Sequence, residues 1–226
     1  MNESHFDIST KDWVQPNGIC LVIIDMQQVL NEYSPIVSEQ ENLLASYSVK
    51  DFSENLSVVV ENLKTLISFY RENQLPIVYT RIGHHYEDLR DMPRIHRVRF
   101  SRLTDANGDS YFMMPGYRQY EIIDEIKPDK SDIVIDKSTS DSFHGTNLDI
   151  ILRNSDISRL VVVGSVTTCC VSSTTRSAFD LGYLPTVLSD ASIATSEKFH
   201  EAELTILKTY YANVLTCNEF FDTINL

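Results

Sequence analysis

The sequence is poor in basic residues. Its 226 residues include 19 Lys and Arg against 32 Asp and Glu, which gives a formal net charge of −13. Nucleic acids and anionic membrane surfaces are bound through clusters of positive charge. The balance therefore argues against either of them as a main partner. We interpret the acidity as a property of a well-solvated surface.

Cysteines and long apolar runs are also scarce. The four cysteines, at 20, 169, 170 and 217, are too few for a disulfide framework in a chain of this length. No apolar run approaches the ~20 residues that a membrane-spanning helix needs. The first fifteen residues have neither the basic region nor the apolar core of a secretory signal. We therefore predict a reduced, cytoplasmic protein.

Glycine and proline are infrequent as well, with seven of each, and 42% of the residues are hydrophobic. This composition excludes collagen-like and disordered chains and fits one globular domain. We predict a single domain over residues 1–226, in which 1–17 form an N-terminal extension.

Short apolar runs rich in β-branched residues alternate with longer stretches of helical periodicity. This alternation is typical of parallel βαβ units. Because the runs are apolar at successive positions, we expect both faces of the strands to be buried. The sequence thus predicts a three-layer α/β/α fold with a six-stranded, mostly parallel sheet. Strands are expected at 19–25, 76–80, 132–136, 160–164, 185–188 and 213–216, and helices at 53–74, 147–154, 171–181 and 197–211.

Two segments interrupt this rhythm, 31–51 after the first strand and 84–116 after the second. The second contains the loop-forming sequences DANGDS and MMPG and is long for a compact domain. Long loops at strand ends often carry function. We predict that 84–116 is a long active-site loop.

Three residues with complementary chemistry stand at the ends of predicted strands. Asp25 closes the first strand, Lys137 closes the third, and Cys170 follows the fourth at the start of a predicted helix. Ligands of open parallel sheets bind at this edge. A helix N-terminus and a nearby lysine favour a thiolate, and a carboxylate can accept the thiol proton. Each residue alone also suits a structural role, but their joint placement predicts an active site.

Three segments resemble the isochorismatase-like cysteine hydrolases. LVIIDMQ is similar to the opening strand of that family, DKSTSDSFHGTNL to its lysine segment, and GSVTTCCVSSTTRSAFDLGY to its nucleophile segment. The resemblance implies a catalytic triad of Asp25, Lys137 and Cys170. It also implies a cis peptide between Ser165 and Val166, an oxyanion hole made by the N–H groups of Val166 and Cys170, and a turn held by Thr167.

The resemblance narrows the chemistry. Members that cleave vinyl ethers commonly lack the nucleophile, so Cys170 favours hydrolysis of a C–N bond through a thioester. Metal-binding members carry D-x-H after the second strand, where this chain has Arg81 and Gly83. No metal and no cofactor are therefore expected. The expected partner is a small-molecule amide or ureide.

The segment TRIGHHYEDLRDMPRIHRVR resembles the biuret and ureide amidohydrolases within that family. By this resemblance, and from their positions, the candidates for substrate binding are Leu30, His84, Ser140, Phe143 and Tyr210. At 30, 140 and 210 the chain departs from the biuret-type pattern toward a less polar pocket, which argues against biuret itself. Phe143 and Tyr210 equally suit a place in the core.

Two other functions stay open at this point. Asp25 alone suits the general acid of a vinyl-ether hydrolase acting on an isochorismate-like acid. The same fold also suits an interaction protein without enzymatic activity. Family resemblance further suggests a homo-oligomer, a dimer or tetramer, with 31–51 and the C-terminal helix as interface elements.

Overall fold

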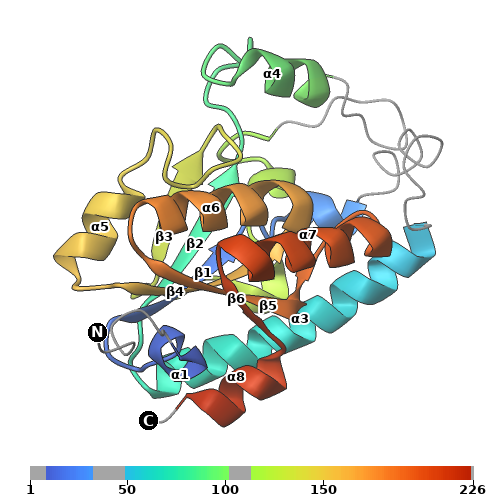
Figure 1. The fold of residues 1–226 in the computed structure, drawn as a ribbon. Coiled ribbons are helices and arrows are strands. Elements are labelled where there is room, and N and C mark those ends of the chain that lie inside the picture. The colour runs from blue at the N-terminus through green and yellow to red at the C-terminus, as the bar shows by residue number, and fades with distance from the viewer. Residues whose placement is uncertain (1–8, 33–48, 102–112, 225–226) are drawn as a thin grey trace.

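The computed structural model describes residues 9–32, 49–101 and 113–224. Six strands form one sheet in the order β3-β2-β1-β4-β5-β6, and every neighbouring pair is parallel (Figure 1). This confirms the predicted α/β sheet. The strands are β1 (Ile19–Ile24), β2 (Ile77–Ile82), β3 (Ile133–Lys137), β4 (Arg159–Ser165), β5 (Leu184–Ile193) and β6 (Asn213–Leu215).

Helices cover both faces of the sheet (Figure 1). The long helix α3 (Val49–Glu72) and α8 (Cys217–Thr223) pack on one face, and α5 (Leu148–Asn154), α6 (Ser172–Asp180) and α7 (Glu197–Tyr210) pack on the other. The other described helical elements are α1 (Thr10–Trp13), α4 (Arg94–Phe100), three 3-10 turns, η2 (Gln28–Glu32), η3 (Arg118–Tyr120) and η4 (Asp124–Ile126), and the π-turn η5 (Thr167–Val171).

The central strand β1 contributes side chains to two hydrophobic clusters, one on each face of the sheet. All six of its residues are buried, and successive side chains point to opposite faces. Leu21 and Ile23 join the cluster under α3, whereas Cys20 and Val22 join the cluster under α5, α6 and α7. The two edge strands, β3 and β6, are less buried than was expected for strands covered on both faces. In β3, Val134 keeps 38% of its surface exposed, and β6 is only half-buried, because each has a neighbour on one side only.

Strand β5 is longer than predicted. It continues through the polar stretch around Asp190 to Ile193, after a register shift between Val162 and Gly164 of the neighbouring β4. Gly164 has φ +113°, and a Cβ atom there would lie 2.3 Å from the carbonyl oxygen of Ile24. A residue with a side chain is excluded by both the backbone angle and the contact. Glycine thus allows the end of β4 to approach the end of β1, beside Asp25.

Three of the described α-helices were not predicted: α1, α4 and α8. Helix α8 begins with a capping box, in which Thr216 and Glu219 bond each other's backbone N–H groups. Helix α4 lies in the 84–116 segment, where Ile95 and Val98 are exposed, so its apolar residues show no core-facing pattern. The rest of that segment at 102–112, most of the proposed interface segment 31–51 and residues 1–8 of the N-terminal extension lie outside the described residues.

Candidate active site

The site begins at Asp25, the first residue after β1. Its backbone has φ +49°, in the left-handed region, and its side chain is buried. The Thr80 hydroxyl on β2 donates a hydrogen bond to Oδ1 of Asp25 at 2.7 Å, and the Lys137 ammonium donates to Oδ2 at 2.7 Å. A buried carboxylate needs such partners, since it has lost its water. Both oxygens of Asp25 are therefore fixed.

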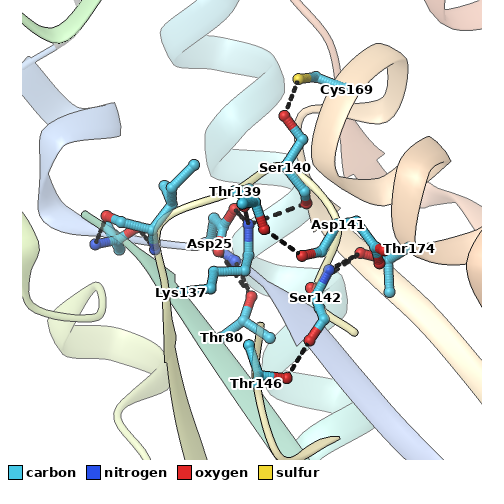
Figure 2. Close-up of polar contacts among 12 residues, drawn as sticks. Asp25, Thr80, Lys137, Thr139, Ser140, Asp141, Ser142, Thr146, Cys169 and Thr174 are labelled. Atoms are coloured by element: carbon cyan, nitrogen blue, oxygen red, sulfur yellow. Dashed lines mark hydrogen bonds and ion pairs between the residues drawn. The ribbon is translucent and has the colours of Figure 1, made fainter. Parts of the chain in front are cut away.

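Lys137, the last residue of β3, is the cationic centre of the site. Its side chain has no exposed surface, and Nζ also donates to the carbonyl oxygens of Thr139 at 2.9 Å and Ser140 at 3.1 Å (Figure 2). Burial alone lowers the pKa of Lys137, but the charge of Asp25, its hydrogen bond to the ammonium and the nearby Cys170 outweigh burial and raise that pKa. The ammonium is therefore charged and faces both the carboxylate and the thiol.

The loop after β3 is tied to helix α6. Ser177 donates to the Asp141 carboxylate at 2.8 Å, and the Ser142 amide donates to the Thr174 hydroxyl at 3.1 Å. Within the loop, the Thr139 hydroxyl donates to the carbonyl of Asp141 at 2.9 Å (Figure 2). These contacts hold the carbonyl groups around Lys137 in register with the helix that follows Cys170.

Cys170 lies in the π-turn η5, between β4 and α6, and is buried. The peptide bond between Ser165 and Val166, just before this turn, is cis. The carbonyl oxygen of Val166 accepts hydrogen bonds from the amides of Cys169 at 2.9 Å and Val171 at 3.3 Å. The turn is thereby closed on itself, with Cys170 inside it.

The electrostatics of Cys170 differ from the sequence-based expectation of a thiolate. A hydrogen bond with Cys169 and burial raise the pKa of the Cys170 thiol, and the nearby charge of Asp25 raises it further. The positive charge of Lys137 lowers this pKa but does not outweigh them, since that charge already faces the Asp25 carboxylate. The resting residue is therefore a thiol.

Two of the predicted substrate-binding residues lie in the loops around the triad. Ser140 follows Lys137, and its hydroxyl is 3.2 Å from the Sγ atom of Cys169 (Figure 2). His84 is buried in the loop after β2, and its Nδ1 atom is 2.9 Å from the carbonyl oxygen of Tyr86. Ser140 therefore lies beside the nucleophile turn, whereas His84 shapes its own loop.

The other three predicted binding residues are placed elsewhere. Leu30 packs in the core cluster under α3, and Phe143 packs against the other cluster, stacked on Tyr183 at 5.6 Å between ring centroids. Tyr210 ends α7, just before β6 begins, and 68% of its surface is exposed. Because α7 runs back from the carboxyl edge of the sheet, Tyr210 lies at the opposite edge from Asp25. Leu30 is thus part of the core and Tyr210 lies away from the triad, whereas Phe143 packs against the cluster that also contains Cys170.

Three residues of the site were not predicted. His96 on α4 places Nε2 3.2 Å from the Ser140 hydroxyl, so α4 reaches the triad loop. Gln27 is fully buried, and its amide nitrogen donates to the carbonyls of Ile82 and Tyr120 at 3.1 and 2.7 Å, which joins the loops after β1 and β2. Thr80 supports Asp25. A usable signal existed only for Thr80, a polar residue within an apolar strand.

Replacing Thr80 with valine is expected to lower both stability and activity. The two side chains have nearly the same shape, so the change removes the hydrogen bond to Asp25 and leaves one buried carboxylate oxygen without that donor. The expected loss is about 1–3 kcal/mol in the free energy of unfolding, measured by urea denaturation. Thr80→Ser keeps the hydroxyl and serves as the control. Equal stability of the Val variant and the wild type would contradict this role.

The histidines at 84 and 85 do not converge on one point. His84 contacts Tyr86, and His85 Nδ1 lies 3.2 Å from Asp91. Within 9–32, 49–101 and 113–224, no three side chains of His, Cys, Asp or Glu gather as a metal ion would require. Arg81, which stands at the D-x-H position, pairs with Asp136 and Glu121.

The described helices include none with the length and apolar character needed to cross a bilayer.

The structure places an aspartate, a lysine and a cysteine at the carboxyl edge of a parallel sheet. The family model for the isochorismatase domain matches residues 19–219. The chain therefore belongs to the isochorismatase family and is a hydrolase, which confirms the resemblance stated above.

Relatives and solved structures are similar over nearly the whole chain. The ureidoacrylate amidohydrolase RutB from Cronobacter sakazakii is 28% identical over 219 residues, which cover 93% of this chain and 90% of that protein. A cysteine hydrolase from Pseudomonas syringae pv. phaseolicola has a TM-score of 0.75 at 22% identity, covering 93% and 94% of the two chains. The N-carbamoylsarcosine amidase from Thermoplasma acidophilum has a TM-score of 0.65 at 26% identity, covering 88% and 96%.

Proposed function

We propose that this hydrolase cleaves the C–N bond of a small amide or ureide, with Cys170 as the nucleophile. The observation that carries the proposal is the buried ion pair of Asp25 and Lys137, whose two charges both act on the Cys170 thiol. Two similar proteins support the substrate class, because one is called a ureidoacrylate amidohydrolase and the other an N-carbamoylsarcosine amidase. Both names describe a C–N bond next to a carbonyl group.

In the first step, Asp25 takes the proton of the Cys170 thiol while the sulfur attacks the carbonyl carbon. This order follows from the raised pKa of the thiol, which keeps the proton on sulfur until the base removes it. As Asp25 becomes neutral, the positive charge of Lys137 stabilises the negative charge that develops on the sulfur. The carbonyl oxygen becomes an oxyanion, for which the N–H groups of Val166 and Cys170 are the proposed donors.

In the second step, the C–N bond breaks and the nitrogen takes the proton held by Asp25. Ammonia or an amine leaves, and the carbonyl carbon stays bonded to sulfur as a thioester, or as a thiocarbamate when the substrate is a ureide. Water then attacks this carbon, Asp25 accepts one of its protons, and the proton returns to the departing sulfur. The enzyme regains its thiol and its Asp25–Lys137 ion pair, and the products are an acid and ammonia or an amine.

The surroundings of the thiol suit a neutral, polar acyl group. Ser140 and His96 bring a hydroxyl and an imidazole to the nucleophile turn, and Arg81 is held by two carboxylates. The reacting carbonyl is therefore expected to carry a carboxamide or ureido nitrogen.

The test is release of ammonia from a panel of small carboxamides and ureides, with ureidoacrylate and N-carbamoylsarcosine included. We expect turnover of at least one member and an acyl adduct on Cys170, visible by mass spectrometry after rapid acid quench. No turnover across the panel would overturn the proposal. Pyruvate release from isochorismate by a Cys170→Ala variant would instead support vinyl-ether hydrolysis.

A further inference from the structure

A half-buried histidine, His200, links helix α7 to the turn that carries Cys170. The Nδ1 atom of His200 lies 2.8 Å from the Thr167 hydroxyl, and its Nε2 atom lies 3.1 Å from the carbonyl oxygen of Ser189 on β5. Thr167 has no exposed surface. Three elements, η5, α7 and β5, therefore meet at one imidazole ring.

The partners of the ring determine its tautomer. A carbonyl oxygen only accepts hydrogen bonds, so Nε2 of His200 must carry a proton and donate it to Ser189. In the neutral ring Nδ1 is then an acceptor, and the Thr167 hydroxyl donates to it. The direction of the Thr167 bond is thus fixed as long as His200 is uncharged.

The environment keeps this histidine neutral near pH 7. Burial lowers the pKa of His200, and the charges of Glu201 and Glu197 on its own helix offset this only in part. The groove of about 230 Å³ beside the ring brings Asn55, Val58 and Val59 from α3, none of which titrates. From β5 comes Asp190, whose carboxylate accepts a hydrogen bond from the Cys217 amide at 2.8 Å.

The anchored residue occupies a sensitive place in the turn. Thr167 is the first residue of η5 and directly follows Val166, whose carbonyl oxygen closes the turn. Cys170 lies three positions after Thr167. A displacement of such a turn by about 1 Å can cost about 100-fold in rate, because the reacting atoms lose alignment. The bond to His200 is the side-chain contact that ties the start of this turn to α7.

We propose that His200 is a positioning residue for the hydrolysis: through the Thr167 hydroxyl it fixes the turn that presents Cys170 and the adjoining N–H groups to the substrate carbonyl. The proposal rests on the proposed function of Cys170. Substrate binding does not involve the ring, so its loss lowers kcat and leaves KM nearly unchanged. Protonation puts a hydrogen on Nδ1, so the Thr167 hydroxyl can no longer donate to the ring, and the arrangement of the turn that this bond holds in the neutral state is lost.

Three substitutions separate the two bonds of the ring. His200→Asn keeps a side-chain acceptor near the position of Nδ1 and so retains the bond to Thr167. His200→Gln reaches the position of Nε2 and retains only the bond to Ser189. His200→Ala loses both. We expect kcat to fall by about 10- to 100-fold in the Gln and Ala variants and by no more than about threefold in the Asn variant.

The partner and the pH provide further tests. Thr167→Val is expected to lower kcat as much as His200→Ala does. The double variant with both changes is expected to lose no more than either single variant. Thr167→Ser keeps the hydroxyl and is expected to preserve kcat. In the wild type, kcat falls as the pH drops below about 6.5, through the lowered pKa of His200. This fall in kcat at low pH is expected to be absent in His200→Asn. Glu197→Gln moves it to lower pH, because that carboxylate raises the pKa of the ring.

Measurements of stability and of KM distinguish a positioning role of His200 from a role in folding or in substrate binding. Urea denaturation of each variant shows whether it is folded, and kcat is compared among folded variants only. Equal kcat in the Gln, Asn and wild-type proteins would overturn the positioning role, as would a loss confined to KM. If instead Cys170→Ala retains full activity, the nucleophile assignment fails. That outcome is separate from any result at His200.

Discussion

Replacing Cys170 with alanine is expected to lower kcat for amide hydrolysis by at least about 10⁴-fold. In the proposed mechanism the sulfur atom forms the bond to the substrate carbon, so without it the two-step route is lost and only polarisation of the carbonyl is left. The alanine side chain is smaller and apolar, and the Asp25–Lys137 pair keeps its own bonds. The loss is therefore expected without unfolding. Ammonia release and the unfolding midpoint in urea measure the two quantities.

Cys169→Ala is the matched control for this experiment. It removes a thiol from the neighbouring position, where Sγ contacts the Ser140 hydroxyl. The same change removes the hydrogen bond that raises the pKa of Cys170. Iodoacetamide is therefore expected to alkylate Cys170 at lower pH in Cys169→Ala than in the wild type. A Cys169→Ala variant as inactive as Cys170→Ala would contradict the assignment of Cys170 as the nucleophile.

Replacing Lys137 with methionine is expected to abolish activity and also to destabilise the protein by about 3–5 kcal/mol. The change leaves the Asp25 carboxylate buried and without its cation, and among the described side chains only that of Thr80 still donates to it. The thiol also loses the positive charge that lowers its pKa, so attack by the sulfur becomes harder. Urea denaturation and ammonia release test both parts.

The double variant Asp25→Asn/Lys137→Met separates stability from catalysis. Both partners of the ion pair are then neutral, so the cost of an unpaired buried charge disappears. We expect the double variant to be more stable than Lys137→Met alone and to be equally inactive. A double variant that is less stable than the single one would show that the ion pair itself, rather than the unpaired carboxylate, determines the loss.

The fold was predictable where local pattern and tertiary burial coincide. The stretch before Asp25 is apolar throughout, and helix α3 has its apolar residues at helical spacing. Both elements lie close to their predicted ranges. Strand β5 was cut short because its second half is polar around Asp190 and pairs only after the register shift opposite Gly164. Helix α8 carried a readable capping signal at Thr216, whereas α4 has no core-facing stripe.

The sequence predicted those site residues whose positions are determined by the ends of the strands. Asp25 and Lys137 meet because parallel strands end at one edge, and this follows from topology. Leu30 and Tyr210 were inferred from the resemblance to the biuret-type pattern, yet one lies in a core cluster and the other at the far end of α7. The charge state of Cys170 was missed as well, because it depends on burial and on the Cys169 thiol rather than on distance from a helix start.

Ser140 contributes to this site in two separable ways. Its backbone carbonyl accepts from Lys137, while its hydroxyl faces His96 and Cys169. Every amino acid supplies that carbonyl, so the residue at 140 can change without altering the acceptors of the ammonium. If residue 140 contacts the substrate, as the proposed function expects, its side chain can alter substrate preference while the Asp25–Lys137 ion pair keeps its contacts. For protein engineering, we therefore expect 140 to be a position at which selectivity can be varied without changing the ion pair.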